Sequence, residues 1–229
     1  MGFVIGLLAF GAALWLLYWV KQRDLTHCRE VLGLTQISSA VQERGSTPEG
    51  FAFVDYAVLQ GSMLGRSARL VHRMVRSPLA PRRQRYGSNF TVLVLTLEHP
   101  VSASLRLQPA GMLGVVETLV RGAVTDRVPI DTTFDQAYSV YSDHPAAAMA
   151  ILAMQPLRER LLAFRSRMAG ELPNSVAGKM ASGLVLGSFH VEGKVARYLA
   201  FGSPTKATAE QLAAAAPILL DLATAAGGR

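Results

Sequence analysis

The feature that most constrains this chain is a run of nineteen uncharged residues, from Gly2 to Val20. As a helix, this run would extend about 28 Å, close to the thickness of the hydrocarbon core of a bilayer. A secretory signal normally begins with a basic side chain and ends at a small-residue cleavage site, and this run has neither. We therefore predict a membrane-spanning helix. A cleaved signal and a buried core helix are the alternatives.

The residues at the end of this run favour the same interpretation. Trp15, Tyr18 and Trp19 are of the type that gathers at lipid headgroups, and Lys21 and Arg23 follow directly. No basic side chain precedes the run, so the positive-inside rule places the remaining chain in the cytoplasm and the N-terminus outside. The predicted location is the bacterial inner membrane, with a single pass.

One face of the predicted span carries only small residues. They are Gly2, Gly6, Ala9 and Ala13, at the spacing i, i+4, i+7 and i+11. Small residues allow a second helix to approach closely, so we predict that other transmembrane subunits pack against this face. Alternatively, glycine and alanine are simply common in membrane helices. The run has no histidine to ligate a haem or pigment, and we expect no cofactor.

The positive charge of the chain is concentrated in one segment. The formal net charge is +7, and a single stretch holds seven arginines and no acid: Arg66, Arg69, Arg73, Arg76, Arg82, Arg83 and Arg85. A nucleic-acid site would interleave aromatic residues with the cations, and few are present, so we expect no nucleic acid. Anionic membrane lipid or an acidic face of another subunit fits better. A merely solvated loop is an equally good explanation.

Hydrophobic periodicity predicts an α+β fold after the anchor. We expect a transmembrane anchor at 1–23, a helical linker at 24–50, and one soluble domain of mostly antiparallel strands with several helices at 51–229. The clearest strand is 90–97, and residues 104–107 could pair with it. The arginine-rich run 66–76 reads as either strand or amphipathic helix, and the glycines before it favour a strand.

The second half of the domain is expected to contain helices and one hairpin. Residues 124–141 have extended character, and Ser142 or Asp143 is the expected cap of a helix that contains Pro145. Residues 183–201 predict a hairpin with a glycine turn. A final alanine-rich helix is expected from Thr205 or Thr208 to residue 226.

Two stretches carry a resemblance to a known group of proteins. Residues 61–66 read GSMLGR, and residues 134–148 read FDQAYSVYSDHPAAA. This pattern resembles uncharacterised bacterial single-pass membrane proteins with a cytoplasmic α+β domain of unknown function. The resemblance covers about residues 61–201 and implies a fold and a membrane setting, with no chemistry to carry over. Asp135 within it is expected to make a structural hydrogen bond.

The sequence contains no recognisable catalytic motif. The five histidines are scattered, there is one cysteine, and no glycine-rich phosphate loop or nucleophile elbow is complete. We therefore expect no enzyme. The predicted function is an accessory or scaffold subunit of a larger membrane protein complex, such as a respiratory or photosynthetic assembly, which bridges partners on the cytoplasmic side. The alternative is a free membrane-tethered domain that binds anionic lipid or a small ligand.

Overall fold

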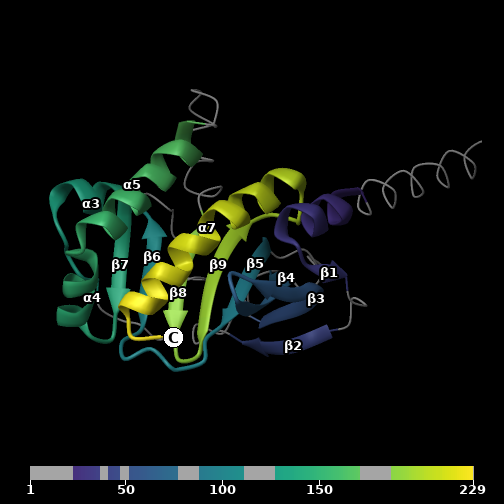
Figure 1. The fold of residues 1–229 in the computed structure, drawn as a ribbon, viewed down its shortest axis with the longest axis horizontal. Helices are drawn as coiled ribbons and strands as arrows, with labels where there is room; N and C mark the ends of the chain where they lie inside the picture. The colour runs from purple at the N-terminus through teal and green to yellow at the C-terminus, as the bar shows by residue number, and fades with distance from the viewer. Residues whose placement is uncertain are drawn as a thin grey trace, which may run out of the picture.

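The structure is a computed structural model that describes residues 23–36, 41–46, 52–76, 88–110, 127–170 and 187–228. Nine strands form one antiparallel sheet in the order β1-β3-β4-β5-β9-β8-β6-β7, with β2 paired to β3 beside this path (Figure 1). The strands are β1 Thr35–Gln36, β2 Val41–Ser46, β3 Ala52–Met63, β4 Arg66–Arg76, β5 Ser88–Thr96, β6 Leu105–Pro109, β7 Tyr138–Ser142, β8 Ser188–Glu192 and β9 Val195–Phe201.

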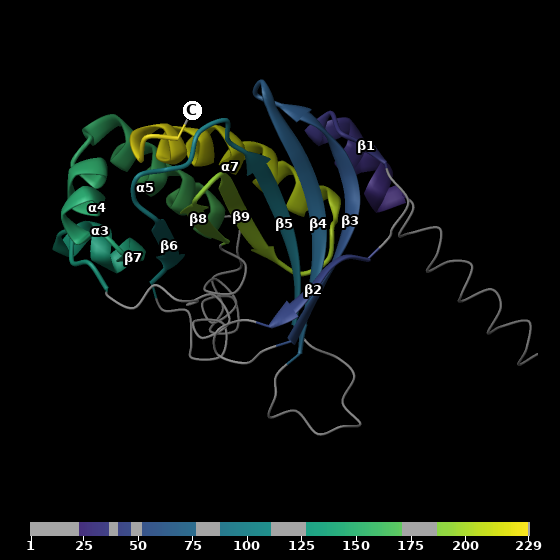
Figure 2. The same cartoon turned by 90° about the horizontal axis from the view of Figure 1, so that it is seen from below.

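The described helices cover one face of this sheet. They are residues 23–32, α3 Thr132–Ala137, α4 Pro145–Leu152, α5 Gln155–Gly170 and α7 Lys206–Ala225. In Figure 2 the sheet is seen from below, and α7 and α5 lie on the same side of its strands. Helix α7 contacts β5, β8 and β9, so it packs over the middle of the sheet.

The main hydrophobic core lies between this sheet face and the helices. The largest fully buried side chains include Phe134, Tyr138, Phe189 and Tyr198. The rings of Phe189 and Tyr198 are 4.7 Å apart, at the distance where aromatic pairs attract one another. Burial of these rings holds β7, β8 and β9 against α3, α5 and α7.

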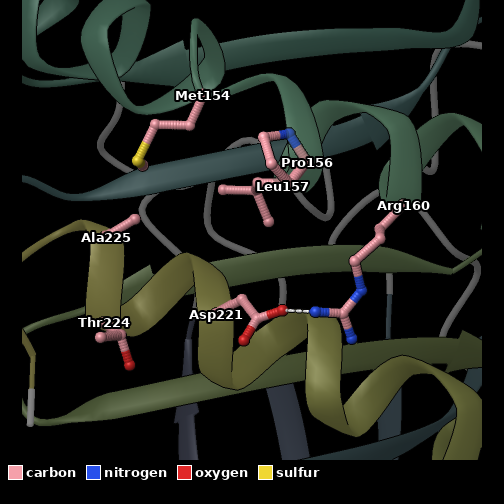
Figure 3. Close-up of a pocket in the computed structure, with 7 residues that line it drawn as sticks. All are labelled: Met154, Pro156, Leu157, Arg160, Asp221, Thr224 and Ala225. Atoms are coloured by element: carbon pink, nitrogen blue, oxygen red, sulfur yellow. Dashed lines mark hydrogen bonds and ion pairs between the residues drawn. The ribbon is translucent and has the colours of Figure 1, made fainter.

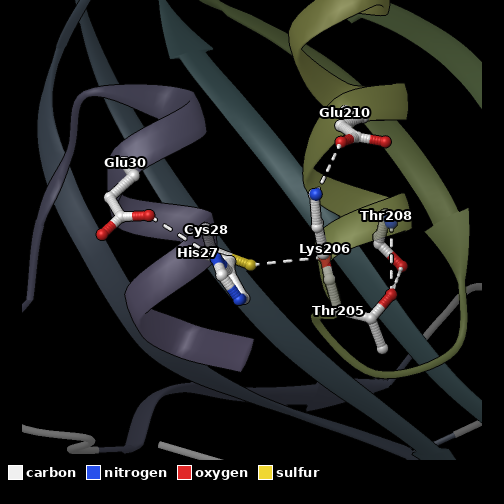
Figure 4. Close-up of polar contacts among 7 residues, drawn as sticks. All are labelled: His27, Cys28, Glu30, Thr205, Lys206, Thr208 and Glu210. Carbon is white, nitrogen blue, oxygen red and sulfur yellow. Dashed lines mark hydrogen bonds and ion pairs between the residues drawn. The ribbon is translucent and has the colours of Figure 1, made fainter. Parts of the chain in front are cut away.

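The helical residues 23–32 belong to the same core. Leu25, Cys28 and Leu32 are buried in it, and Cys28 lies beside the start of α7 (Figure 4). The thiol of Cys28 donates a hydrogen bond to the carbonyl oxygen of Thr205 at 3.5 Å. The expected linker 24–50 thus contributes a helix to the core and two strands, β1 and β2, to the sheet.

The predicted fold class and location need correction. None of the helices in the described residues is long and apolar enough to cross a membrane, so a fold that begins with a transmembrane helix is not supported. The predicted span Gly2–Val20 lies outside the described residues, together with Lys21 and every residue of its small-residue face. The predicted location, a single pass through the bacterial inner membrane with a cytoplasmic domain, depended on a membrane-spanning helix and is therefore not supported either.

The long apolar stretch near the C-terminus forms a helix that packs on the sheet. Helix α7 has 20 residues and is interrupted by charged side chains such as Glu210 and Asp221. Its buried side includes Leu212, Leu219 and Leu222, which face the sheet core. A helix with one apolar side and one charged side is typical of a core helix that covers a sheet.

Several predicted elements are confirmed, and two are wrong. The run 66–76 is strand β4, residues 188–201 form the β8–β9 hairpin, and Thr205 caps α7. The predicted pairing of 104–107 with 90–97 is wrong, because both edges of β5 are occupied by β4 and β9. Strand β6 pairs instead with β7 and β8.

The second wrong element is the extended segment expected before Tyr138. It contains the helix α3, because the Asp131 side chain accepts a hydrogen bond from the backbone N–H of Phe134 at 3.0 Å. The expected cap of α4 is also corrected. His144 occupies that position without a side-chain cap, while Ser142 and Asp143 both bond to Ser104.

Candidate functional site

The face of the sheet that points away from the helices carries a mixed surface of apolar and basic side chains. Successive residues of a strand point to opposite faces, so each strand contributes to both. A second apolar cluster, built only from strand residues, lies on this second face: Val71, Val75, Phe90, Val92, Val94 and Leu199. Phe53 and Val195 pack against it. We call this side of the sheet the second face.

A row of basic residues runs across the second face beside this cluster. The strand register pairs Arg69 with Val94, Val94 with Arg197, Arg197 with His190, and His190 with Arg106. Residues directly opposite one another on antiparallel strands have side chains on the same face, with Cβ atoms about 5 Å apart. We call Arg69, Arg197, His190 and Arg106 the basic row. They are far apart in sequence, and only the sheet topology brings them together.

His190 lies at the centre of the row, between two arginines. Its pKa is lowered well below its ordinary value, first by burial and then by the positive charges of Arg106, Arg197 and Arg73. The imidazole is therefore neutral at pH 7, and its Nε2 atom lies 3.2 Å from the hydroxyl of Ser188. The charged groups that lower this pKa are all cations, so His190 lies among positive side chains.

A buried amide lies next to the row. Gln108 is on β6, two residues after Arg106, and therefore faces the same side of the sheet. The residue is 1% exposed, and its Nε2 atom has no hydrogen-bond partner. An unsatisfied buried amide costs about 1–3 kcal/mol, so such groups are uncommon unless a ligand or water completes them.

A salt bridge borders the second face on β3 and β4. The guanidinium of Arg73 donates two hydrogen bonds of 2.7 Å to the carboxylate of buried Asp55. The same guanidinium lies 4.4 Å from the centre of the Phe53 ring. The two-pronged geometry holds Arg73 in place. The charge of Arg73 is thus balanced by Asp55 within the fold.

The structure divides the predicted arginine segment among different environments. Arg69 and Arg73 lie on the second face, whereas Arg66 is at the β3–β4 hairpin and forms an ion pair with Glu98. Arg76 is the last residue of β4. Arg82, Arg83 and Arg85 lie outside the described residues. Of the predicted interfacial anchors, only Arg23 is described; it is exposed at the start of the helical residues 23–32.

A shallow groove lies between α5 and α7, on the helical side of the molecule (Figure 3). It has a volume of about 490 Å³, and its walls include Met154, Pro156, Leu157 and Ala225. One end is closed by the ion pair between Arg160 and Asp221. Its lining offers apolar contact and one charge pair, without a group of converging polar side chains.

The buried titratable groups of the core are occupied by structural hydrogen bonds. The Tyr198 hydroxyl accepts from the Gly187 N–H at 3.1 Å and from the Gln211 amide at 2.8 Å, and burial raises its pKa. The Tyr138 hydroxyl donates to the carbonyl of Leu161 at 3.1 Å, and burial raises its pKa as well. In the part of the chain that the structure describes, no cluster of three or more His, Cys, Asp or Glu could hold a metal ion.

The sequence did not single out Arg106, Gln108, His190 or Arg197 as members of one site. Each stands alone in an alternating strand pattern, where a polar residue between apolar ones normally indicates a solvated face. A usable signal was present only in β6, whose sequence LRLQP places two polar side chains on the face opposite its leucines. The pairing of β6 with β8 could not be read from the sequence.

No protein-family model matches the chain, and no curated protein matches it significantly. Among solved structures, the crystal structure of the mycobacterial trehalose monomycolate transport factor A is similar, with a TM-score of 0.54. The two chains are 12% identical, and the match covers 90% of this chain and 95% of that chain. At this identity the likeness shows a shared class of fold, an antiparallel sheet with helices, and extends over most of both chains.

Proposed function

We propose that this chain is a non-enzymatic accessory subunit of a transport assembly. The observation that carries the proposal is the fold likeness to a transport factor, because it spans nearly the whole of both chains. The designation of that protein as a transport factor supports an accessory role in transport for this chain. It favours a transport assembly over the respiratory or photosynthetic complex expected from the sequence.

The chemistry of the buried side chains supports a binding role. Burial and, to a smaller extent, the negative charge of Asp24 raise the pKa of Cys28 to about 11, so the thiol is protonated at pH 7. A protonated, buried thiol is a poor nucleophile. Burial likewise keeps Tyr138 and Tyr198 protonated, and their hydroxyls are engaged with the backbone. These groups are used to hold the fold together.

The expected partners are transmembrane subunits of a transporter, with anionic lipid as a second class. On the second face, exposed Arg69 and half-buried Arg197 provide positive charge for such partners. The groove between α5 and α7 provides apolar surface on the opposite side. A domain with two chemically different sides is suited to contact two components at once, as a bridging subunit does.

Co-purification from the source cells tests this proposal. The tagged chain is extracted in mild detergent at its native expression level, separated by size, and its partners are quantified by mass spectrometry. The proposal expects a membrane transporter in fixed stoichiometry, and reduced transport of that partner's substrate when the gene is deleted. Elution as a bare monomer, or unchanged transport after deletion, contradicts it.

Two arginines of β4 provide matched variants for the same experiment. Arg69→Glu reverses a charge on the second face, and Arg66→Glu reverses one at the hairpin. If the partner docks on the second face, Arg69→Glu lowers its recovery and Arg66→Glu does not. Equal recovery from both variants assigns the contact to another surface and leaves the accessory role itself intact.

A further inference from the structure

The second face brings several oxyanion-binding groups together. Arg197, His190 and Arg106 are consecutive in the strand register, from β9 through β8 to β6. Gln108 adds an amide two residues along β6, and Ser188 adds a hydroxyl two residues before His190. These side chains come from three strands of a rigid sheet, a placement that fixes their mutual geometry better than a loop would.

We propose that Arg106, Arg197 and Gln108 form the binding site for a phosphate-like oxyanion, with His190 and Ser188 beside it. The anion is either free or the headgroup of a lipid. This inference goes beyond the accessory role and does not depend on it, since binding is a property of the isolated chain.

The buried amide of Gln108 is the observation that points to a ligand. Its Nε2 atom carries two N–H donors, is sealed from solvent and has no acceptor. If the Gln108 amide served only the fold, its N–H groups would normally have an acceptor, because an unsatisfied buried donor is destabilising. An oxyanion at the row would accept this hydrogen bond, and it would be stronger than one to a neutral acceptor.

The two arginines supply the charge that such a ligand needs. Arg106 is 8% exposed, and Arg197 is half-buried on the neighbouring side of His190. Both already interact with other groups. A guanidinium has five N–H donors in a planar fork, so one interaction leaves donors for an anion. Burial strengthens each of these bonds relative to the same bond in water.

The state of His190 agrees with an anion site of this kind. Its pKa is lowered by burial and also by the positive charges of Arg106, Arg197 and Arg73. Several cations therefore lie near the site. The acid of this face that faces Arg73 is Asp55, which is bound to it in a bidentate pair. Glu192 lies two residues from His190 on the same strand and is exposed. A bound anion would neutralise part of the positive charge of these cations.

A nuclear magnetic resonance titration of the isolated chain tests the site without any variant. Inorganic phosphate is added at constant ionic strength, with chloride as the matched control. Saturable shifts of the His190 imidazole signals and of the Gln108 side-chain amide are expected with phosphate and not with chloride. Absence of these shifts in the folded wild-type chain, both with phosphate and with the anionic lipid described below, overturns the proposal.

Three variants separate a specific site from general attraction. Arg197→Gln is expected to weaken phosphate binding about tenfold or more, because it removes a charge-assisted hydrogen bond. Arg66→Gln, at the β3–β4 hairpin, is the control and should leave binding within about twofold. Gln108→Leu should weaken binding while leaving the melting temperature unchanged or higher, because it removes an unpaired buried amide.

The result for Gln108→Leu distinguishes a ligand site from a structural one. If the amide served only the fold, its replacement would lower the melting temperature and leave phosphate affinity unchanged, and this outcome overturns the proposal. Circular dichroism confirms that each variant is folded. If Arg197→Gln fails to fold, Arg197→Lys replaces it, and loss of the planar fork should still weaken binding.

A last arm distinguishes the two sources of the anion. Short-chain phosphatidylglycerol below its micelle concentration is compared with phosphate, and short-chain phosphatidylcholine is the control. If a lipid headgroup is the ligand, phosphatidylglycerol shifts the same His190 and Gln108 signals at lower concentration than phosphate. If the ligand is a free anion, phosphate is the tighter of the two. Failure of both to shift these signals overturns the site, whatever the co-purification shows.

Discussion

At the residue scale, Gly187 has the least room for a side chain among the glycines of the described residues. It lies directly before β8, and its backbone N–H donates to the Tyr198 hydroxyl. A Cβ atom at this position would lie 2.5 Å from Tyr198 Cζ and 2.6 Å from its hydroxyl oxygen, and would also meet the backbone carbonyl of Leu199. These atoms are fully buried, so they cannot easily move aside.

We predict that Gly187→Ala destabilises the chain by about 1–3 kcal/mol, because the added methyl overpacks a core site. Chemical denaturation measures the loss as a lower midpoint. The control is Gly193→Asn in the β8–β9 turn, where φ is +53° and no atom would contact an added Cβ. Asparagine tolerates this backbone conformation, so its effect should stay within about 0.5 kcal/mol. Equal stability of the wild type and Gly187→Ala would contradict the packing described for Tyr198.

Another residue-scale prediction concerns the reactivity of Cys28. Its thiol is buried, donates to the carbonyl of Thr205, and has a pKa raised to about 11. Below that pH the group is a thiol, and only the thiolate reacts with alkylating agents. We predict that iodoacetamide labels the folded chain at pH 8 far more slowly than the denatured chain. Equal labelling rates would mean that residues 23–32 do not pack against the start of α7.

At the scale of elements, the N-terminus of α7 depends on one capping side chain. The Thr205 hydroxyl accepts a hydrogen bond from the N–H of Thr208 at 3.2 Å. We predict that Thr205→Ala lowers the free energy of unfolding by about 1 kcal/mol, because that N–H loses its partner. Thr205→Ser retains the hydroxyl and should remain close to the wild type. A similar loss for both variants would show that the methyl group matters more than the cap.

The link between β6 and the β7–α4 turn should depend on pH. Burial acts to raise the pKa of Asp143, but hydrogen bonds from the Ser104 side chain and backbone N–H outweigh it and hold the pKa below its ordinary value of 3.8. A carboxyl whose pKa is depressed in the folded state stabilises that state above its unfolded pKa. This contribution is lost as the pH falls below about 4 and through the folded value.

We therefore predict that stability declines on acidification through this range, and that Asp143→Asn makes the decline shallower. Thermal unfolding at a series of pH values measures both slopes. Identical slopes for the wild type and the variant would show that the bond to Ser104 makes no pH-dependent contribution.

At the scale of the whole molecule, local patterns were predictable and the pairing between them was not. The glycines before 66–76 and the turn at Gly193 correctly indicated β4 and the β8–β9 hairpin, because both predictions depend on nearby residues. The position of β9 between β5 and β8 depends on contacts between residues about a hundred positions apart. Strand order of this kind leaves no periodic signal in one sequence.

The same limit explains what was missed at the candidate site. The seven arginines in one segment were conspicuous as a run, yet β4 directs its alternate residues to opposite faces and the structure pairs Arg66 and Arg73 with acids. The basic row instead combines residues of β4, β6, β8 and β9 through the register. The topology of the sheet thus brings basic residues together that are far apart in the sequence.

The pKa of His190 tests most directly whether these cations share one face. The measurement is a titration of the histidine imidazole signals by nuclear magnetic resonance, with His190 assigned through His190→Gln. Because burial and the charges of Arg106, Arg197 and Arg73 disfavour its protonation, His190 should remain neutral well below pH 6.5. A pKa at or above 6.5 in the folded chain would contradict the positive field at His190, and with it the second face as a site for anionic partners.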